Sequence, residues 1–130
     1  SQNASLMKKL LILLLLCVGF DSYAQQNKIV FFSPFYQESN ISYKKLPVLI
    51  TITNDEIIIQ DAVNKFILQR YTIIKVKNSK LSIGNRMDYL TVNSNLNYTR
   101  IYLFFNEKEN EIYLAVQEAG IVFRELKQIK

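Results

Sequence analysis

The chain contains no histidine and a single cysteine, Cys17, which lies in its apolar N-terminal segment. The residues after this segment therefore lack the side chains that build the usual nucleophile and base pairs, histidine metal sites and thiolate clusters. These absences exclude most mechanisms of secreted hydrolases. They also exclude a disulfide within the chain, so its stability must come from packing.

Glycine is scarce as well, and none of the three glycines lies in a loop of the kind that cradles phosphate groups. Nucleotide binding is therefore not expected. Carboxylate chemistry remains, but a glycosidase needs two carboxylates that face each other across a cleft, and the spacing of the acids indicates no such pair. We expect no enzymatic activity and no cofactor, with a minimal carboxylate hydrolase as an alternative. The acids concerned are Asp55, Glu56, Asp61, Asp88, Glu107, Glu109, Glu111, Glu118 and Glu125.

The N-terminal region has the three parts of a secretory signal peptide. Lys8 and Lys9 supply the charge that orients it, and the apolar run at 10–18 supplies the short hydrophobic helix. Ser22 and Ala24 form a small-x-small cleavage site. The sequence therefore predicts a bacterial protein that is exported to the periplasm or the cell exterior.

This reading divides the chain into an upstream remnant at 1–6, a signal peptide at 7–24 and a single β-domain at 25–130. The uncharged stretch at 10–20 has 11 residues, well short of the roughly 20 that span a bilayer, so no transmembrane span is expected in the mature chain. A lipid anchor at Cys17 is not expected either. Lipoprotein signals place a small residue before the acylated cysteine, and Leu16 is large.

The predicted domain has 106 residues, enough for one hydrophobic core but not for two. The whole chain has 16 basic and 11 acidic residues, and without Lys8, Lys9 and Asp21 the domain keeps 14 and 10, a net charge of +4. Such mild basicity favours polyanions only if the charges gather on one face. A cell-surface polyanion binder is therefore a second alternative, and nucleic-acid binding is not expected.

Strand-forming residues dominate the predicted domain, in which isoleucine, valine, threonine, tyrosine and phenylalanine are abundant. Residues 34–46 form the one long connection, expected as a mobile lid or a short helix. The fold class is all-β, a small antiparallel meander of about eight strands that closes as a barrel or packs as a sandwich. The expected strands are 28–33, 47–53, 56–60, 65–77, 87–93, 98–106, 111–117 and 121–127.

Eight short strands after a leader resemble lipocalin-like barrels in architecture. The chain has no tryptophan and therefore lacks the Gly-x-Trp motif with which that family opens. The resemblance implies an architecture only, and no residue role is transferred from it.

The alternation of apolar residues predicts two hairpins. Ile52 must lie opposite Ile57, which leaves Asn54 and Asp55 as a two-residue turn, and both residue types tolerate left-handed backbone angles. In the second hairpin Phe105 must lie opposite Ile112, with a loop of either two or four residues. The last strand has apolar residues on both faces, so its register stays open.

Alternation along 65–77 leaves Arg70 in a row of otherwise apolar, core-facing residues, where it lines an interior cavity or sits at a bulge. Lys75, Lys77 and Lys80 are explained by a charged strand exterior or by a protected sheet edge. The residues expected toward solvent are Lys65, Gln69, Tyr71, Lys75 and Lys77, and those expected toward the core are Phe66, Leu68, Ile74 and Val76.

Aromatic residues beside an arginine form the candidate ligand site. On the expected strand 98–106, alternation turns Tyr98, Arg100, Tyr102 and Phe104 outward, and Tyr113 follows on the neighbouring strand. Aromatic faces next to a guanidinium are the chemistry that stacks sugar rings, bases and flat ligands. In the alternative reading these rings are cross-strand pairs that stabilise the sheet, half covered by a neighbouring segment.

Taken together, these features predict an exported, non-catalytic β-domain that binds a small apolar or aromatic ligand or a partner protein. No metal site is expected, since the predicted domain has neither histidine nor cysteine.

The export prediction can be checked by intact-mass measurement of the protein recovered from a bacterial envelope fraction. Cleavage after Ala24 should give a chain that starts at Gln25. A cytoplasmic species that retains Met7 would contradict export.

Overall fold

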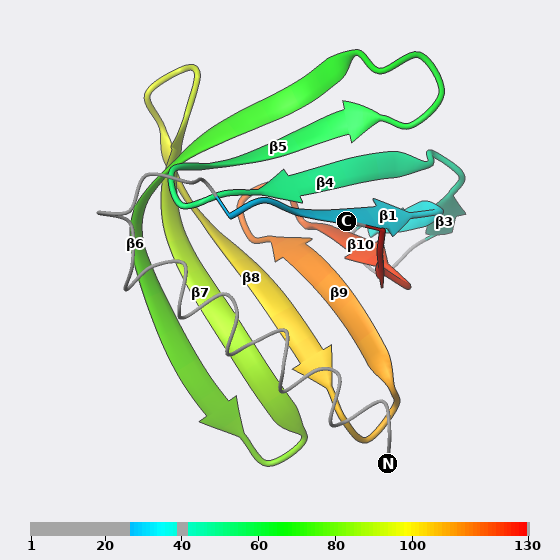
Figure 1. The fold of residues 1–130 in the computed structure, drawn as a ribbon, viewed down its shortest axis with the longest axis vertical. Coiled ribbons are helices and arrows are strands. Elements are labelled where there is room, and N and C mark those ends of the chain that lie inside the picture. The colour runs from blue at the N-terminus through cyan, green and yellow to red at the C-terminus, as the bar shows by residue number, and fades with distance from the viewer. Residues whose placement is uncertain (1–26, 39–41, 130) are drawn as a thin grey trace.

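The computed structural model describes residues 27–38 and 42–129, which form one antiparallel sheet and, within these ranges, no helix (Figure 1). The all-β prediction is confirmed, but the sheet has 11 strands rather than eight. The predicted signal peptide and Cys17 lie outside the described residues. The strands are β1 (Ile29–Ser33), β2 (Phe35–Glu38), β3 (Ser42–Lys44), β4 (Val48–Ile52), β5 (Glu56–Asp61), β6 (Ile67–Leu81), β7 (Gly84–Asn93), β8 (Tyr98–Asn106), β9 (Glu111–Val116), β10 (Ile121–Arg124) and β11 (Lys127–Gln128).

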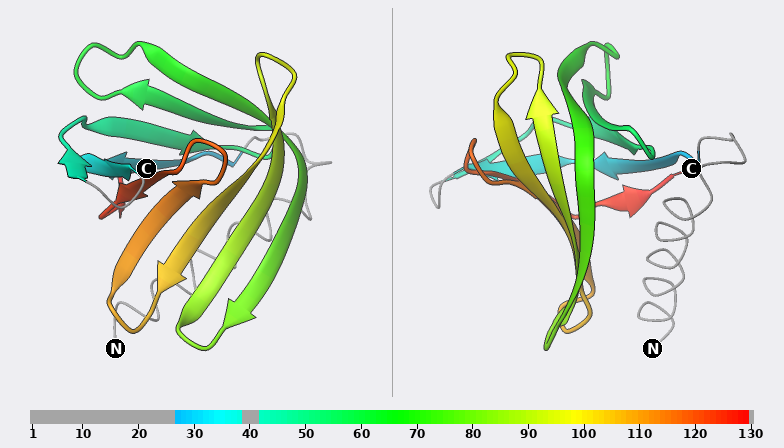
Figure 2. Two further views of the ribbon diagram at one scale, coloured as in Figure 1. Left: turned by 180° about the vertical axis from the view of Figure 1, so that it is seen from behind. Right: turned by 90° about the vertical axis from the view of Figure 1, so that its left-hand side faces the viewer.

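The strand order is β11-β1-β4-β5-β6-β7-β8-β9-β10-β2-β3. Strands β4 to β10 follow one another as the predicted meander. At both ends of the sheet, strands from the beginning of the domain lie next to strands from its end, β1 beside β11 and β2 beside β10. The sheet coils strongly (Figure 2) but is not closed as a barrel, so the closed barrel expected as one of two architectures is not observed.

Pro34 divides the first strand of the domain in two. Proline has no N–H to donate to a ladder, and the Ser33 hydroxyl donates instead to the carbonyl oxygens of Phe35, at 3.0 Å, and Arg124, at 2.7 Å. Before the break β1 pairs with β4 and β11, and after it β2 pairs with β10 and β3. The prediction of a lid or helix at 34–46 is therefore wrong, because β2 and β3 form there.

The last predicted strand, 121–127, is broken at Glu125, which has a φ of 50°. Before the break Phe123 lies opposite Leu114 and faces the core. Strict alternation would then turn Leu126 outward. The left-handed backbone of Glu125 interrupts the alternation, and Leu126 is buried as well. Phe123 and Leu126, one from each apolar set of this segment, thus both reach the core, which explains why alternation left the register open.

Both predicted hairpins are confirmed. Ile52 lies opposite Ile57, and the Thr53 hydroxyl accepts the backbone N–H groups of Asp55 and Glu56 at 3.2 and 3.1 Å. Neither Asn54 nor Asp55 has a positive φ, so the turn does not use the left-handed angles expected of them. In the second hairpin Phe105 lies opposite Ile112, with the four-residue loop 107–110.

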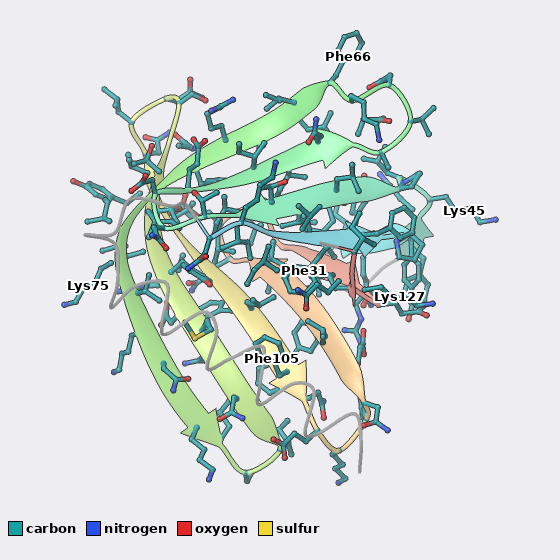
Figure 3. All side chains as sticks on the ribbon, viewed as in Figure 1. Phe31, Lys45, Phe66, Lys75, Phe105 and Lys127 are labelled. Carbon is teal, nitrogen blue, oxygen red and sulfur yellow. The ribbon has the colours of Figure 1, made fainter. Side chains whose placement is uncertain are left out.

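The hydrophobic core lies inside the coil of the sheet. Phe31 of β1 and Phe105 of β8, both fully buried, project into the space that the strands enclose (Figure 3). They pack with the inward residues of β4, β5, β7 and β9. The buried cluster contains Ile29, Phe31, Val48, Ile50, Ile52, Ile57, Ile59, Tyr71, Met87, Tyr89, Ile101, Leu103, Phe105, Leu114, Val116, Phe123 and Leu126.

The faces predicted for 65–77 are wrong in the first part of β6, because two bulges interrupt its alternation. The register shifts at Gln60, which lies opposite Ile67 while Ile59 lies opposite Gln69, and again between Ile73 and Lys75. Each extra residue moves the following side chains to the other face. Tyr71, expected in solvent, is buried, while Phe66, Leu68 and Ile74, expected in the core, are exposed.

Arg70 lies between the two bulges and is exposed, so it neither lines an interior cavity nor sits at a bulge. Its guanidinium binds both carboxylate oxygens of Glu56 at 3.1 Å. Phe66 stands at the end of the β5 and β6 hairpin and points away from the sheet (Figure 3).

Leu103 and Tyr102 give a direct test of the register of β8. Leu103 is fully buried, so Leu103→Ala should lower the free energy of unfolding by about 2 to 5 kcal/mol through lost transfer energy and the remaining cavity. Tyr102 is half-buried on the outer face, and Tyr102→Ala should cost about 1 kcal/mol. Urea unfolding measures both values, and equal costs would contradict the register.

Candidate functional site

The register of the sheet places the predicted site residues on one outer face. Tyr98, Arg100, Tyr102 and Phe104 alternate along β8 with residues that are buried inside the coil. Phe104 lies opposite Tyr113 on β9 and opposite Arg86 on β7. The five predicted residues thus share a face, but the structure divides them into two groups.

At one end of this face the aromatic rings are occupied by other side chains. The rings of Phe104 and Tyr113 stack with centroids 5.1 Å apart and an interplanar angle of 18°. The Arg124 guanidinium lies 5.0 Å from the Tyr113 centroid and binds the Glu111 carboxylate at 2.6 Å. Phe104 is only 5% exposed, so no ring face of this group is free for a ligand.

Burial raises the pKa of the Tyr113 phenol above its usual value, and the positive charge of Arg124 opposes this shift. The phenol therefore stays protonated at neutral pH. A neutral ring held between Phe104 and Arg124 is suited to stacking rather than to proton transfer. These residues fit the structural reading, in which cross-strand aromatic pairs stabilise the sheet.

At the other end of the face Tyr98 and Arg100 are exposed and line a hollow of about 420 Å³. Tyr98 is 64% exposed, which leaves most of its ring in water. One guanidinium nitrogen of Arg100 lies 3.4 Å from the Asp88 carboxylate. We name this site the β8 hollow. It is lined by Leu90, Tyr98, Thr99, Arg100, Gln117 and Glu118.

Tyr102 connects the two ends of the face. Its hydroxyl donates to the Gln117 side-chain oxygen at 3.1 Å, and Arg86 lies 4.7 Å from the centre of its ring. Because Gln117 also lines the β8 hollow, Tyr102 holds one wall of the hollow in place without lining it. The sequence could not assign this role, since it depends on a contact across two strands.

Sequence reasoning missed Leu90 and Glu118 as lining residues. Leu90 lies opposite Arg100 on β7, and Glu118 follows the end of β9. The available signal for Leu90 was the pairing of β7 with β8, which requires the register of a hairpin whose turn contains no glycine, whereas Glu118 lies beyond the last paired residue of β9.

A second hollow, of about 460 Å³, lies where β2 and β3 meet and is almost entirely apolar. The rings of Phe35 and Tyr43 meet edge to face, with centroids 5.0 Å apart. Pro34, Lys45 and Pro47 complete its lining. Apart from Lys45 it lacks a charged group to orient a ligand, so we favour the β8 hollow as the functional site.

Several acidic side chains form ion pairs with lysine or arginine side chains. Besides the pairs already described, Lys44 binds Glu38 at 3.2 Å. The Glu38 carboxylate and its hydrogen bond raise the pKa of Lys44. Among the described residues no group of three or more acidic, histidine or cysteine side chains is placed to hold a metal ion. In the same part of the chain no helix is long and apolar enough to cross a membrane.

Comparison with models of protein families, with curated proteins and with solved structures gave no match. The function is therefore argued from the geometry of the site.

The structural role of the stacked group predicts a measurable coupling between Phe104 and Tyr113. A double-mutant cycle of Phe104→Ala and Tyr113→Ala, followed by urea unfolding, should give a coupling free energy of about 0.5 to 1.5 kcal/mol. The control pair is Tyr98→Ala with Tyr113→Ala, whose positions do not pair across β8 and β9. Their effects should add, and additive effects for both pairs would contradict the stack.

Proposed function

We propose that this chain is an exported, non-catalytic β-domain that binds a small, flat aromatic ligand in the β8 hollow. The proposal rests on one observation: the exposed ring of Tyr98 and the exposed guanidinium of Arg100 line the same hollow. The signal peptide predicted at 7–24 supports export, and the proposed location is the periplasm or the cell exterior.

The hollow supplies the contacts that a flat ligand requires. Tyr98 offers an aromatic face for offset stacking, and Leu90 adds an apolar surface beside it. Arg100 has five N–H donors, and only one of its nitrogens contacts Asp88, so donors remain for an anionic or carbonyl group. Gln117 and Glu118 complete the polar side of the hollow. An aromatic ring that carries an acidic substituent fits this combination best.

The size of the hollow agrees with a small ligand. Its volume of about 420 Å³ lies in the lower part of the range of roughly 300 to 1,000 Å³ that is typical of small-molecule sites. The surrounding sheet supports rigidity at Arg100, which lies opposite Leu90 of β7 and whose carbonyl accepts the Gln117 N–H at 3.0 Å, while Tyr98 pairs with Val92 at the end of β8. A rigid site loses less conformational freedom when it binds.

The proposal of a non-catalytic role rests on the chemistry of the acids near the hollow. Asp88, which does not line the hollow, is bonded to Arg100, and Glu118 is the one carboxylate among the lining residues. The predicted domain supplies no histidine or cysteine to act as a base or nucleophile. The site therefore has groups that hold a ligand but lacks a nucleophile and base pair.

The absence of tryptophan provides a sensitive test, because the fluorescence of an indole ligand can be followed without a tryptophan background when it is excited at wavelengths that the eight tyrosines do not absorb. Indole-3-carboxylate should bind more tightly than neutral indole. Tyr98→Ala and Arg100→Gln should each weaken binding of the acid by about fivefold, since stacking and charge contacts contribute about 1 kcal/mol each at exposed sites.

Two matched substitutions serve as controls. Tyr43 is as exposed as Tyr98, at 66%, and Arg70 is an exposed arginine that binds a single carboxylate, as Arg100 does. Tyr43→Ala and Arg70→Gln should leave binding unchanged. Equal losses in the control variants, or binding by neither indole compound at millimolar concentration, would contradict the assignment of the β8 hollow.

A further inference from the structure

The second half of β6 has a free edge. Pairing with β5 ends where Glu56 lies opposite Thr72, followed by one bond from the Ile73 N–H to the Asp55 carbonyl at 2.8 Å. Pairing with β7 continues along the other side of β6 as far as Leu81. Residues 74–81 therefore have no strand beside them on the β5 side within the described chain, as Figure 1 shows at the border of the sheet. We name residues 74–81 the β6 free edge.

The β6 free edge has a marked charge pattern. Lys75, Lys77 and Lys80 are all exposed, and the segment contains no acidic residue. Lys75 points away from the sheet (Figure 3). The nearest acid across the ladder is Asp88, which lies opposite Lys77 but is already bonded to Arg100. The edge therefore presents a positive charge that the sheet does not neutralise.

The edge is also held in a fixed conformation. Its hairpin partner begins at Gly84, where a Cβ atom would lie 1.8 Å from the Phe105 carbonyl oxygen. Next to this close approach the Glu107 N–H donates to the Ile83 carbonyl at 2.9 Å. The end of the hairpin is thus fastened to β8, and a strand that added to the edge would meet a preformed template.

We propose that the β6 free edge binds an extended, acidic segment of a partner protein by β-strand addition. Unpaired main-chain groups of an edge strand accept such a segment, and the three lysines select for glutamate or aspartate on it. Exposed Ile74 and Leu81 at the two ends of the edge add apolar contacts. The occupant is therefore an extended segment with acidic residues in its middle and apolar residues at its ends.

Charge argues against a second copy of this chain as the occupant. Antiparallel pairing of two β6 free edges would gather the three lysines of each copy in one two-stranded ladder, with no acid among them. Like charges across a ladder destabilise it. The same lysines that attract an acidic segment thus keep the edge from pairing with itself.

The test uses an eight-residue peptide of glutamate and valine, matched in length to residues 74–81, with valine at both ends and the glutamates placed opposite Lys75, Lys77 and Lys80. It should bind the full domain, and binding should protect the backbone amides of 74–81 from hydrogen exchange. A peptide with lysine in place of glutamate should not bind. Raising the salt from about 20 to about 200 mM should weaken binding several-fold, because exposed charges are screened.

Charge reversal at the edge gives the matched comparison. The triple variant Lys75→Glu, Lys77→Glu, Lys80→Glu should bind the acidic peptide about tenfold more weakly and should prefer the lysine peptide. The triple variant Lys28→Glu, Lys108→Glu, Lys127→Glu has the same net charge at exposed positions elsewhere and should retain binding. If the first variant does not fold, the single variant Lys77→Gln takes its place, and it should lose proportionately less affinity for the acidic peptide.

A second peptide separates strand addition from simple charge attraction. It keeps the glutamates but has proline in place of valine, so it cannot form a ladder. Equal binding of the two acidic peptides, or binding without protection of the 74–81 amides, would overturn the proposal. Self-association of the unliganded domain through protected 74–81 amides would overturn it in favour of a second copy. None of these measurements involves the β8 hollow, so this proposal fails or stands independently of the ligand proposed there.

Discussion

The coil of the sheet depends on one missing hydrogen-bond donor, the backbone nitrogen of Pro34. A strand that continued through this position would keep the same two neighbours along its whole length. With the ladder interrupted, β1 joins β4 and β11, while β2 joins β10 and β3. The Ser33 hydroxyl then ties the break to the Arg124 carbonyl, at the point where the last strands separate. The first and the last strands of the described chain are thereby bonded to each other inside a single sheet.

The outer face shows how the same residue types serve two purposes. Where an arginine has a carboxylate partner and a ring beneath it, as Arg124 has with Glu111 and Tyr113, the group is closed and stabilises the sheet. Where the ring stands alone in solvent, as Tyr98 does, the same chemistry is left open for another molecule. The difference comes from position along β8 and not from composition. Tyr98 lies at the end of β8, next to the turn that joins it to β7.

Local rules were sufficient for the hairpins and for most of the core. The positions opposite Ile52 and Phe105 follow from alternation because one face of each hairpin must be buried. The same rule failed in β6, since a bulge changes the face of every later residue and leaves no clear mark in the sequence. It also failed for 34–46, where β2 pairs with β10 from the far end of the chain and β3 pairs with β2. Alternation identified the face of the sheet on which the candidate site lies. It could not show which residues of that face are exposed, as Tyr98 is, and which are buried, as Phe104 is.

The pairing of β1 with β11 has a consequence for the order of folding. Phe31 lies opposite Gln128, so the first strand of the domain lacks one neighbour until the last residues of the chain are present. Contacts of such long sequence separation form late, because the entropy of closing the loop must be overcome first. While the chain is being synthesised, its N-terminal part therefore cannot complete the native sheet.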